Sequence, residues 1–249
     1  MNVVILMAAG FNELSETNDR SFPKFLTEIN NKTIVQHVVD GIAPLIDKNY
    51  KIIFVTRKVD DEKYFLSKTL KLLAPNSSVI VNSGQTSGGA ISALLSIEEV
   101  SEKDSLLIIN GDQIIEENLY VLLKNFIDAE VDAGTVVFNS VHPRWSYVKC
   151  DRDGYVIEAA EKKPISNLAT AGFYYYKVAS DFFDSVKKMI LKNSVFNDQF
   201  YVCPAFNEMV LIDKKISIFK IDQKKYHSLM TKKMIQDYED YLLKQDKSN

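Results

Sequence analysis

The chain has 249 residues, of which 46% are hydrophobic and 25% are charged, and its formal net charge is −3. A hydrophobic fraction of this size can fill one large core, so we expect a single domain over residues 1–249. The slightly acidic balance excludes the uniform positive field on which non-specific nucleic-acid binding depends. The two cysteines, Cys150 and Cys203, are too few for a disulfide framework or a zinc site, and we expect both to be reduced.

The apolar run at the N-terminus has no basic segment before it and is much shorter than the ~20 residues that span a bilayer. The sequence therefore predicts a cytoplasmic protein with neither a membrane partner nor a nucleic-acid partner.

Strand-like and helix-like segments alternate in the first half of the chain. Residues 3–8 form a continuous apolar run, which is typical of a strand buried on both faces of a parallel sheet. Further strands are predicted at 51–56, 78–82 and 105–110, and helices at 33–45, 60–73 and 89–100. The first of these helices is expected to begin near Asn31 or Lys32. The alternation indicates βαβ units in a Rossmann-like three-layer α/β/α fold, in which ligands bind outside the carboxyl ends of the strands.

The pattern changes after about residue 130. Short strands joined by turns are predicted at 133–139, 147–150, 155–159 and 170–177. They indicate an antiparallel extension of a mixed, mostly parallel central sheet. Helices at 179–192 and 203–211, a strand at 216–221 and a final amphipathic helix at 232–244 complete the chain.

Small residues at the end of the first strand are a candidate phosphate site. Ala8, Ala9 and Gly10 would let a loop approach an anion closely, and Lys24, which follows Pro23, would add a positive charge. Alone, the three small residues are more often a tight turn than a phosphate site, and a single lysine is more often a solvated surface charge.

Asp112 follows the strand at 105–110 directly. A carboxylate just beyond a buried strand is well placed to hold Mg²⁺, which in turn bridges phosphate oxygens. The alternative is an aspartate that only caps a turn.

A third candidate segment is Glu161-Lys162-Lys163-Pro164, followed by Gly172 on the next strand. A lysine held beside a proline could pair with the phosphate of a second substrate, and the glycine would leave room for its body. The alternative is an exposed charge pair in a loop.

These segments together resemble the sugar-phosphate nucleotidyltransferases, of the glucose-1-phosphate thymidylyltransferase and phosphocholine cytidylyltransferase kind. The resemblance extends over nearly the whole chain and depends on the order of MAAG, the Pro-Lys pair with LTEINNKTIVQHVV, GQTSGGAISALL, IINGDQ, and VIEAAEKKP with ATAGFYYY. It implies a nucleotide-binding half at 1–130 and an acceptor-binding half at 131–249.

The resemblance also implies roles for individual residues. The nucleotide would contact Ala8, Ala9, Gly10, Lys24, Gln85 and Gly88; the acceptor would contact Glu161, Lys162, Lys163 and Gly172; Asp112 would bind Mg²⁺; and Lys24, Asp112 and Lys163 would be the catalytic groups.

The reaction implied by the resemblance is transfer of a nucleoside monophosphate from a nucleoside triphosphate to a phosphorylated sugar or similar small acceptor, with release of pyrophosphate. Gln85 suits a pyrimidine, because its amide both donates and accepts hydrogen bonds. The setting implied is nucleotide-sugar synthesis for a bacterial surface polysaccharide such as a capsule, and a homo-oligomer is compatible with it.

Two departures from the family pattern keep other functions open. The loop Gly10-Phe11-Asn12-Glu13-Leu14 lacks the second glycine and the arginine common in the family, leaving Arg20 or Lys24 as substitutes. The segment 225–231 lacks a carboxylate where the family commonly supplies a second metal-binding aspartate. The alternatives are a CTP-dependent cytidylyltransferase for a non-sugar phosphate or phosphonate, a non-catalytic nucleotide-binding relative, and a GT-A-type glycosyltransferase, which typically uses an Asp-x-Asp motif.

Three further features are interpreted less narrowly. Trp145 or Tyr147 would stack on an acceptor ring or pack in the core, and the segment 197–204 would shape the acceptor pocket or an oligomer interface. His227 would point at phosphate or pack as an ordinary histidine.

Overall fold

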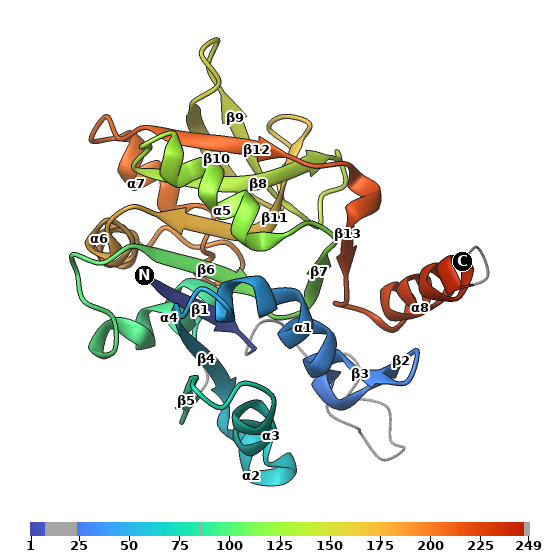
Figure 1. Cartoon of the computed structure of the whole chain (residues 1–249). Helices are drawn as coiled ribbons and strands as arrows, with labels where there is room; N and C mark the ends of the chain where they lie inside the picture. The colour runs from blue at the N-terminus through green and yellow to red at the C-terminus, as the bar shows by residue number, and fades with distance from the viewer. Residues whose placement is uncertain (8–23, 85, 247–249) are drawn as a thin grey trace.

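The computed structural model describes residues 1–7, 24–84 and 86–246 (Figure 1). One nine-stranded sheet forms its centre, with the strand order β10-β9-β11-β6-β1-β4-β5 and with β8 and β12 attached beside β11. This agrees with the predicted mixed sheet.

The first half of the chain supplies the parallel part of the sheet. It consists of β1 (Asn2–Leu6), β4 (Lys51–Arg57), β5 (Ser78–Asn82) and β6 (Leu106–Asn110). Strand β1 pairs in parallel with both β4 and β6, so that Val4 lies opposite Ile53 on one side and Ile108 on the other. All five residues of β1 are buried, as the continuous apolar run predicts.

The second half supplies the antiparallel part, made of β8 (Ala133–Asn139), β9 (Ser146–Cys150), β10 (Val156–Glu161) and β11 (Leu168–Tyr176). Strand β11 joins it to the parallel part, because it runs antiparallel to β6 with Tyr174 opposite Ile108. Strand β12 (Ile216–Lys220) then pairs in parallel with β8. The predicted antiparallel extension is confirmed, with one parallel strand at its edge.

Helices cover both faces of this sheet. One face packs against α1 (Ile34–Ile46), α3 (Leu66–Leu73) and α5 (Leu119–Asp128); the other packs against α4 (Gly89–Leu94), α6 (Ala179–Leu191) and α7 (Ala205–Val210). Helix α8 (Lys232–Asp246) extends the first core and contacts β2 (Glu28–Ile29) and β13 (Tyr226–Ser228). Successive residues of β1 alternate between the two cores, with Val3 and Ile5 in the first and Val4 and Leu6 in the second. The three-layer α/β/α architecture is therefore confirmed (Figure 1).

Two helices differ from the prediction. Helix α1 begins after Thr33, whose side chain and that of Gln36 form a capping box, so the expected start at Asn31 or Lys32 was too early. The segment predicted as one helix at 60–73 is two helices, α2 (Lys58–Tyr64) and α3, because Phe65 between them has a left-handed backbone with φ 54°. The predicted helix at 89–100 is the shorter α4 followed by the 3₁₀ turn η2 (Leu95–Glu98).

Several short elements have no counterpart in the sequence-based interpretation. They are α5, β2 (Glu28–Ile29), β3 (Lys32–Thr33), β7 (Gln113–Ile115), β13 (Tyr226–Ser228) and the 3₁₀ turns η1 (Lys24–Leu26) and η3 (Gln223–Lys225). The pair of β7 with β13 matters most, because it brings residues 226–228 next to the segment that carries Asp112. A three-residue strand is too short to show a periodic pattern.

Cys150 and Cys203 are both free thiols, as expected, and Cys203 is fully buried. Within the described residues, no helix combines the length and the hydropathy needed to cross a membrane.

Candidate active site

A buried ion pair joins two residues that the sequence analysis selected independently. Lys24 begins η1 and Asp112 follows β6, and the Lys24 Nζ lies 2.9 Å from the Asp112 Oδ2. Only 6% and 8% of the two side chains are exposed. Because a buried charge left without its partner costs about 3–5 kcal/mol, each of these side chains depends on the other in the ligand-free protein.

The backbone around Asp112 is fixed from two sides. The amide of Gly111 donates to the Leu6 carbonyl at 3.0 Å, and a side chain at position 111 would overlap Met7. On the other side the amide of Leu229 donates to the Asp112 carbonyl at 2.8 Å. The end of β1 and the residue after β13 therefore hold the aspartate at the carboxyl edge of the parallel strands.

Gln113 connects this aspartate to the strand that carries Gly172. Its Nε2 donates to the carbonyls of Ala171 and Gly172 at 2.5 and 3.1 Å, and its Oε1 accepts from the Tyr226 hydroxyl at 3.2 Å. Gly172 has φ 56°, and a side chain there would overlap Gln113. The glycine is thus required by the approach of Gln113, a buried amide that the sequence analysis did not select.

The residues around Asp112 fit a magnesium ion with few protein ligands. Among the described residues no cluster of three His, Cys, Asp or Glu side chains is arranged to hold a metal. Mg²⁺, however, is usually held by one or two carboxylates together with substrate phosphates and water. Ser228 pairs with Gln113, the residue after Asp112, in the β7–β13 ladder, and its buried Oγ has no hydrogen-bond partner, so this hydroxyl is available to a ligand.

Glu161 and Lys162 lie at the end of β10 on the acceptor side. Glu161 is 8% exposed and accepts a hydrogen bond from the Ser146 hydroxyl. Burial raises the pKa of Glu161 to about 7, although the Ser146 hydrogen bond and the charge of Lys162 act in the opposite direction. A carboxyl with this pKa is partly protonated near neutral pH and can donate or accept a hydrogen bond.

The two adjacent lysines differ in their surroundings. Lys162 is half-buried, has a left-handed backbone with φ 51°, and donates from Nζ to the Tyr201 hydroxyl at 3.1 Å. Lys163 is exposed. The predicted role of Lys163 remains a prediction, and the geometry favours Lys162 as the lysine that is held in place.

A cavity of about 190 Å³ lies beside Trp145, whose carbonyl accepts a hydrogen bond from the Lys162 amide. It is lined by Phe138, Trp145, Gln223, Tyr226, His227, Ser228, Met234, Asp237 and Tyr238. One of its lining atoms, Ser228 Oγ, is buried without a hydrogen-bond partner. Because buried polar atoms are normally paired, this cavity is suited to a ligand that carries polar groups.

The aromatic side chains near the cavity separate the two interpretations made from the sequence. Tyr147 is fully buried and donates to the His142 carbonyl at 2.6 Å, so it belongs to the core. Trp145 lines the cavity, and its ring contacts Phe138 and Tyr226 edge to face. Trp145 is therefore the one of the two that can reach a ligand.

His227 packs between the rings of Tyr238 and Tyr241, with centroid separations of 4.7 and 4.6 Å. Burial lowers its pKa, while the nearby Glu116, whose Oε1 is 3.4 Å from Nε2, raises it. The net direction is downward, so the ring is neutral near pH 7 and does not offer a fixed charge to phosphate.

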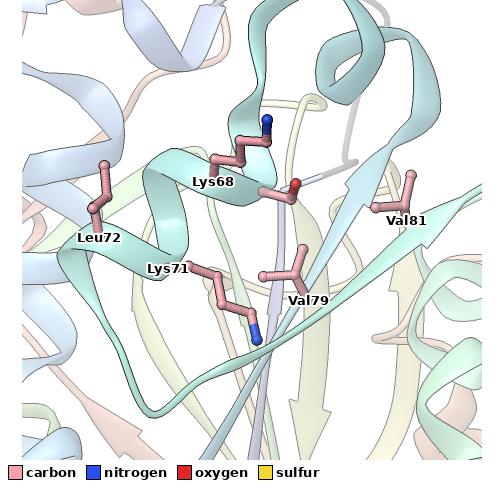
Figure 2. A pocket seen from close by; sticks show the side chains of 6 residues that line it. Lys68, Lys71, Leu72, Val79 and Val81 are labelled. Atoms are coloured by element: carbon pink, nitrogen blue, oxygen red, sulfur yellow. The ribbon is translucent and has the colours of Figure 1, made fainter.

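A larger and more open groove of about 580 Å³ lies elsewhere, between α3 and the edge strand β5 (Figure 2). Its lining is Ser67, Lys68, Lys71, Leu72, Val79 and Val81. It contains no carboxylate and none of the residues selected from the sequence. The region around Asp112 is therefore the candidate site because of its charged and polar side chains, although the groove is larger.

Four predicted nucleotide contacts, Ala8, Ala9, Gly10 and Gln85, lie outside the described residues, as do Arg20 and the altered loop 10–14. Gly88 is described and has φ 107°, and a side chain there would overlap the backbone of Phe200. Its glycine is explained by this packing, and its contact with a nucleotide remains a prediction.

A family model described as "Nucleotidyl transferase" matches residues 5–200, which is most of the chain. The protein therefore belongs to the nucleotidyl transferase family.

Two archaeal proteins are similar to this chain at 27% identity, and both are named bifunctional protein GlmU. The relative from Methanocaldococcus jannaschii matches over 176 residues, 69% of this chain and 39% of its own length; that from Methanococcus maripaludis matches over 197 residues, 76% and 43%. The chain thus spans about two fifths of the length of these curated relatives.

Solved structures share the fold at lower identity. A nucleoside-diphosphate-sugar pyrophosphorylase from Vibrio cholerae RC9 has a TM-score of 0.81 at 21% identity, covering 96% of this chain and 99% of its own. A structure named as a glucose-1-phosphate thymidylyltransferase from Bacillus anthracis, in complex with a sucrose, has a TM-score of 0.76 at 18% identity. The match covers 96% of this chain and 94% of that one.

Proposed function

We propose that this protein transfers a nucleoside monophosphate from a pyrimidine nucleoside triphosphate to a phosphorylated sugar or a similar small acceptor, with release of pyrophosphate. The observation that carries the proposal is the buried Lys24–Asp112 pair at the carboxyl edge of the parallel strands. Family membership supports the reaction class, and the names of the two solved structures support a sugar phosphate as acceptor.

Lys24 and Asp112 would exchange partners when substrate binds. A triphosphate offers anionic oxygens to the Lys24 ammonium, which releases the Asp112 carboxylate for Mg²⁺ together with the free Ser228 hydroxyl. The ion would neutralise charge on the phosphates. Each charge of the ligand-free pair would thus find an opposite charge in the complex.

At the end of β10, Lys162 would bind the phosphate of the acceptor, and Glu161 would form a hydrogen bond with the rest of the acceptor molecule. In-line attack of the acceptor phosphate on the α-phosphorus needs positioning and neutralised charge more than a covalent nucleophile. The cavity lined by Trp145 and Tyr226 would receive the part of the acceptor that extends away from the phosphate.

A second candidate is a relative that binds nucleotide without turnover. The specific observation in its favour is Ser228, which stands beside the Asp112 segment in the stretch where the family commonly supplies its second metal-binding aspartate. With one carboxylate, the metal would be held more weakly.

The test is pyrophosphate release by the purified protein with Mg²⁺, each common nucleoside triphosphate, and a pool of sugar phosphates, phosphocholine and aminoethylphosphonate. Release with a pyrimidine triphosphate and a sugar phosphate is the expected result. Release only with phosphocholine or the phosphonate would replace the sugar by a non-sugar acceptor. If no substrate pair releases pyrophosphate but a nucleotide stabilises the protein against heat, the second candidate is favoured.

A further inference from the structure

Residues 194–201 form a tight turn that we call the 194–201 hairpin. Phe196 and Gln199 exchange both backbone hydrogen bonds, at 3.0 and 3.1 Å, around Asn197 and Asp198. These two central residues have φ 48° and 57°, as in the two-residue turns that fit the twist of a hairpin. The hairpin therefore has one defined backbone shape rather than that of an irregular loop.

One end of the hairpin is fastened to the segment that begins α4. The Phe200 amide donates to the Ser87 carbonyl at 2.7 Å, and the Ala90 amide donates to the Phe200 carbonyl at 3.0 Å. Gly88 lies between these bonds, and only a glycine leaves room there for the Phe200 backbone. The two segments are thus held in direct contact next to a predicted nucleotide contact.

The next residue, Tyr201, is fastened to the acceptor side. Its hydroxyl accepts from Lys162 Nζ at 3.1 Å and donates to Gln199 Oε1 at 3.2 Å. The same ammonium lies 5.1 Å from the centre of the Tyr201 ring and 5.8 Å from that of Phe196. Uncharged groups of the hairpin therefore orient Lys162 and leave its charge available to a phosphate.

We propose that the 194–201 hairpin positions Lys162 and links it to the loop at residues 86–90, with Tyr201 as a positioning residue, so that nucleotide and acceptor bind cooperatively. The proposal rests on the proposed function for the identity of the two ligands. Phe200 and Tyr201 are neighbours in the chain, so fixing one restricts the other. A nucleotide that contacts the 86–90 loop thus acts on Lys162 through the Phe200–Tyr201 backbone, and by reciprocity an acceptor bound to Lys162 strengthens nucleotide binding by the same factor.

The main test compares Tyr201→Phe with the wild type. The variant keeps the ring beside Lys162 and removes only the hydroxyl. We expect the KM for the acceptor to rise about 10-fold, as for loss of a hydrogen bond to a charged group, with kcat and the Kd for the triphosphate in the absence of acceptor unchanged. Nucleotide should also improve acceptor affinity less in the variant than in the wild type.

Tyr120→Phe is the matched control, because it too removes the hydroxyl of a tyrosine whose ring lies beside a lysine, Lys48, at 4.6 Å from the ring centre. It should leave the acceptor KM unchanged. The lysines of the two pairs give a second comparison, in which Lys162→Met should weaken the acceptor and Lys48→Met should not. An unchanged acceptor KM in Tyr201→Phe, or an equal weakening of triphosphate binding in the absence of acceptor, would overturn the proposal.

Hydrogen exchange tests the link without any ligand. In Tyr201→Phe the amides of residues 86–90 and 160–163 should exchange faster than in the wild type, while those of β1 should not change. If the wild type releases no pyrophosphate with any pair of substrates, the proposed function fails. Hydrogen exchange then tests the link between the two segments by itself. Faster exchange in both segments then supports the link, and unchanged exchange in either one refutes it.

Discussion

Two regions of the candidate site each carry a lysine and an acid, and the two regions arrange these charges in opposite ways. At the carboxyl edge of the parallel strands, Lys24 and Asp112 neutralise each other directly in a buried ion pair. At the end of β10, Glu161 bonds to Ser146 and Lys162 bonds to Tyr201, so each charge has an uncharged partner. The first region must exchange partners to bind a ligand, whereas the second is already oriented for one.

The largest effect is expected for Asp112→Asn, which removes the charge from the first region and keeps the shape of the side chain. Turnover should fall about 1000-fold, because Asp112 is the one carboxylate that we propose as a metal ligand. The pyrophosphate assay measures it, and circular dichroism checks the fold. Asp222→Asn, at an exposed site before β13, is the control. Activity within 10-fold of wild type in Asp112→Asn would remove Asp112 from the site.

The second region should make stability depend on pH. The Glu161 pKa is raised from 4.5 to about 7, so its stabilising contribution is fully present below pH 4.5 and is lost as the pH rises through 7. Relative to Glu161→Gln, the free energy of unfolding of the wild type should fall by about 3 kcal/mol between pH 4.5 and 8.

Urea unfolding at several pH values measures this difference. Glu158→Gln, at an exposed position of the same strand, should show no such dependence. A difference between wild type and Glu161→Gln that is constant with pH would mean that Glu161 keeps an ordinary pKa in the folded protein.

Lys24→Met tests the exchange of partners in the first region. Triphosphate binding should weaken about 30-fold, because one charged hydrogen bond to phosphate is lost. Binding of Mn²⁺ in the absence of nucleotide should become tighter, since Asp112 no longer has a competing ammonium. Titration calorimetry with each ligand separates the two effects.

Lys32→Met is the matched control, because Lys32 forms an exposed pair with Asp40 at 2.7 Å. Neither affinity should change in that variant. If Mn²⁺ binds Lys24→Met no more tightly than wild type, Lys24 does not compete with the metal.

Ser228→Asp is expected to give the smallest effect, about a 10-fold gain in Mn²⁺ affinity, because it adds a carboxylate on the strand that pairs with the segment carrying Asp112. The same titration measures it, and Ser101→Asp at an exposed position is the control. Unchanged affinity in Ser228→Asp would mean that the Ser228 side chain does not reach the metal.

The sequence by itself determined the parallel strands, the antiparallel extension and most of the residues around the site. Apolar runs such as residues 3–8 report burial on both faces of a sheet, and this local signal needs no knowledge of neighbours. For the same reason Asp112 could be selected from its place after a buried strand, whereas Lys24, Glu161 and Gly172 were selected from short motifs and from the family resemblance.

Tertiary structure alone decided which of these residues meet. Lys24 and Asp112 are 88 positions apart, and only the placement of η1 against the end of β6 brings them together. Gln113, Ser228 and Tyr201 were not selected individually, because their roles depend on partners that are distant in the chain. The three-residue strand β13, which contains Ser228, is also too short to show a periodic pattern. Local periodicity records how much of a residue is buried, but not which charged or polar group it will face.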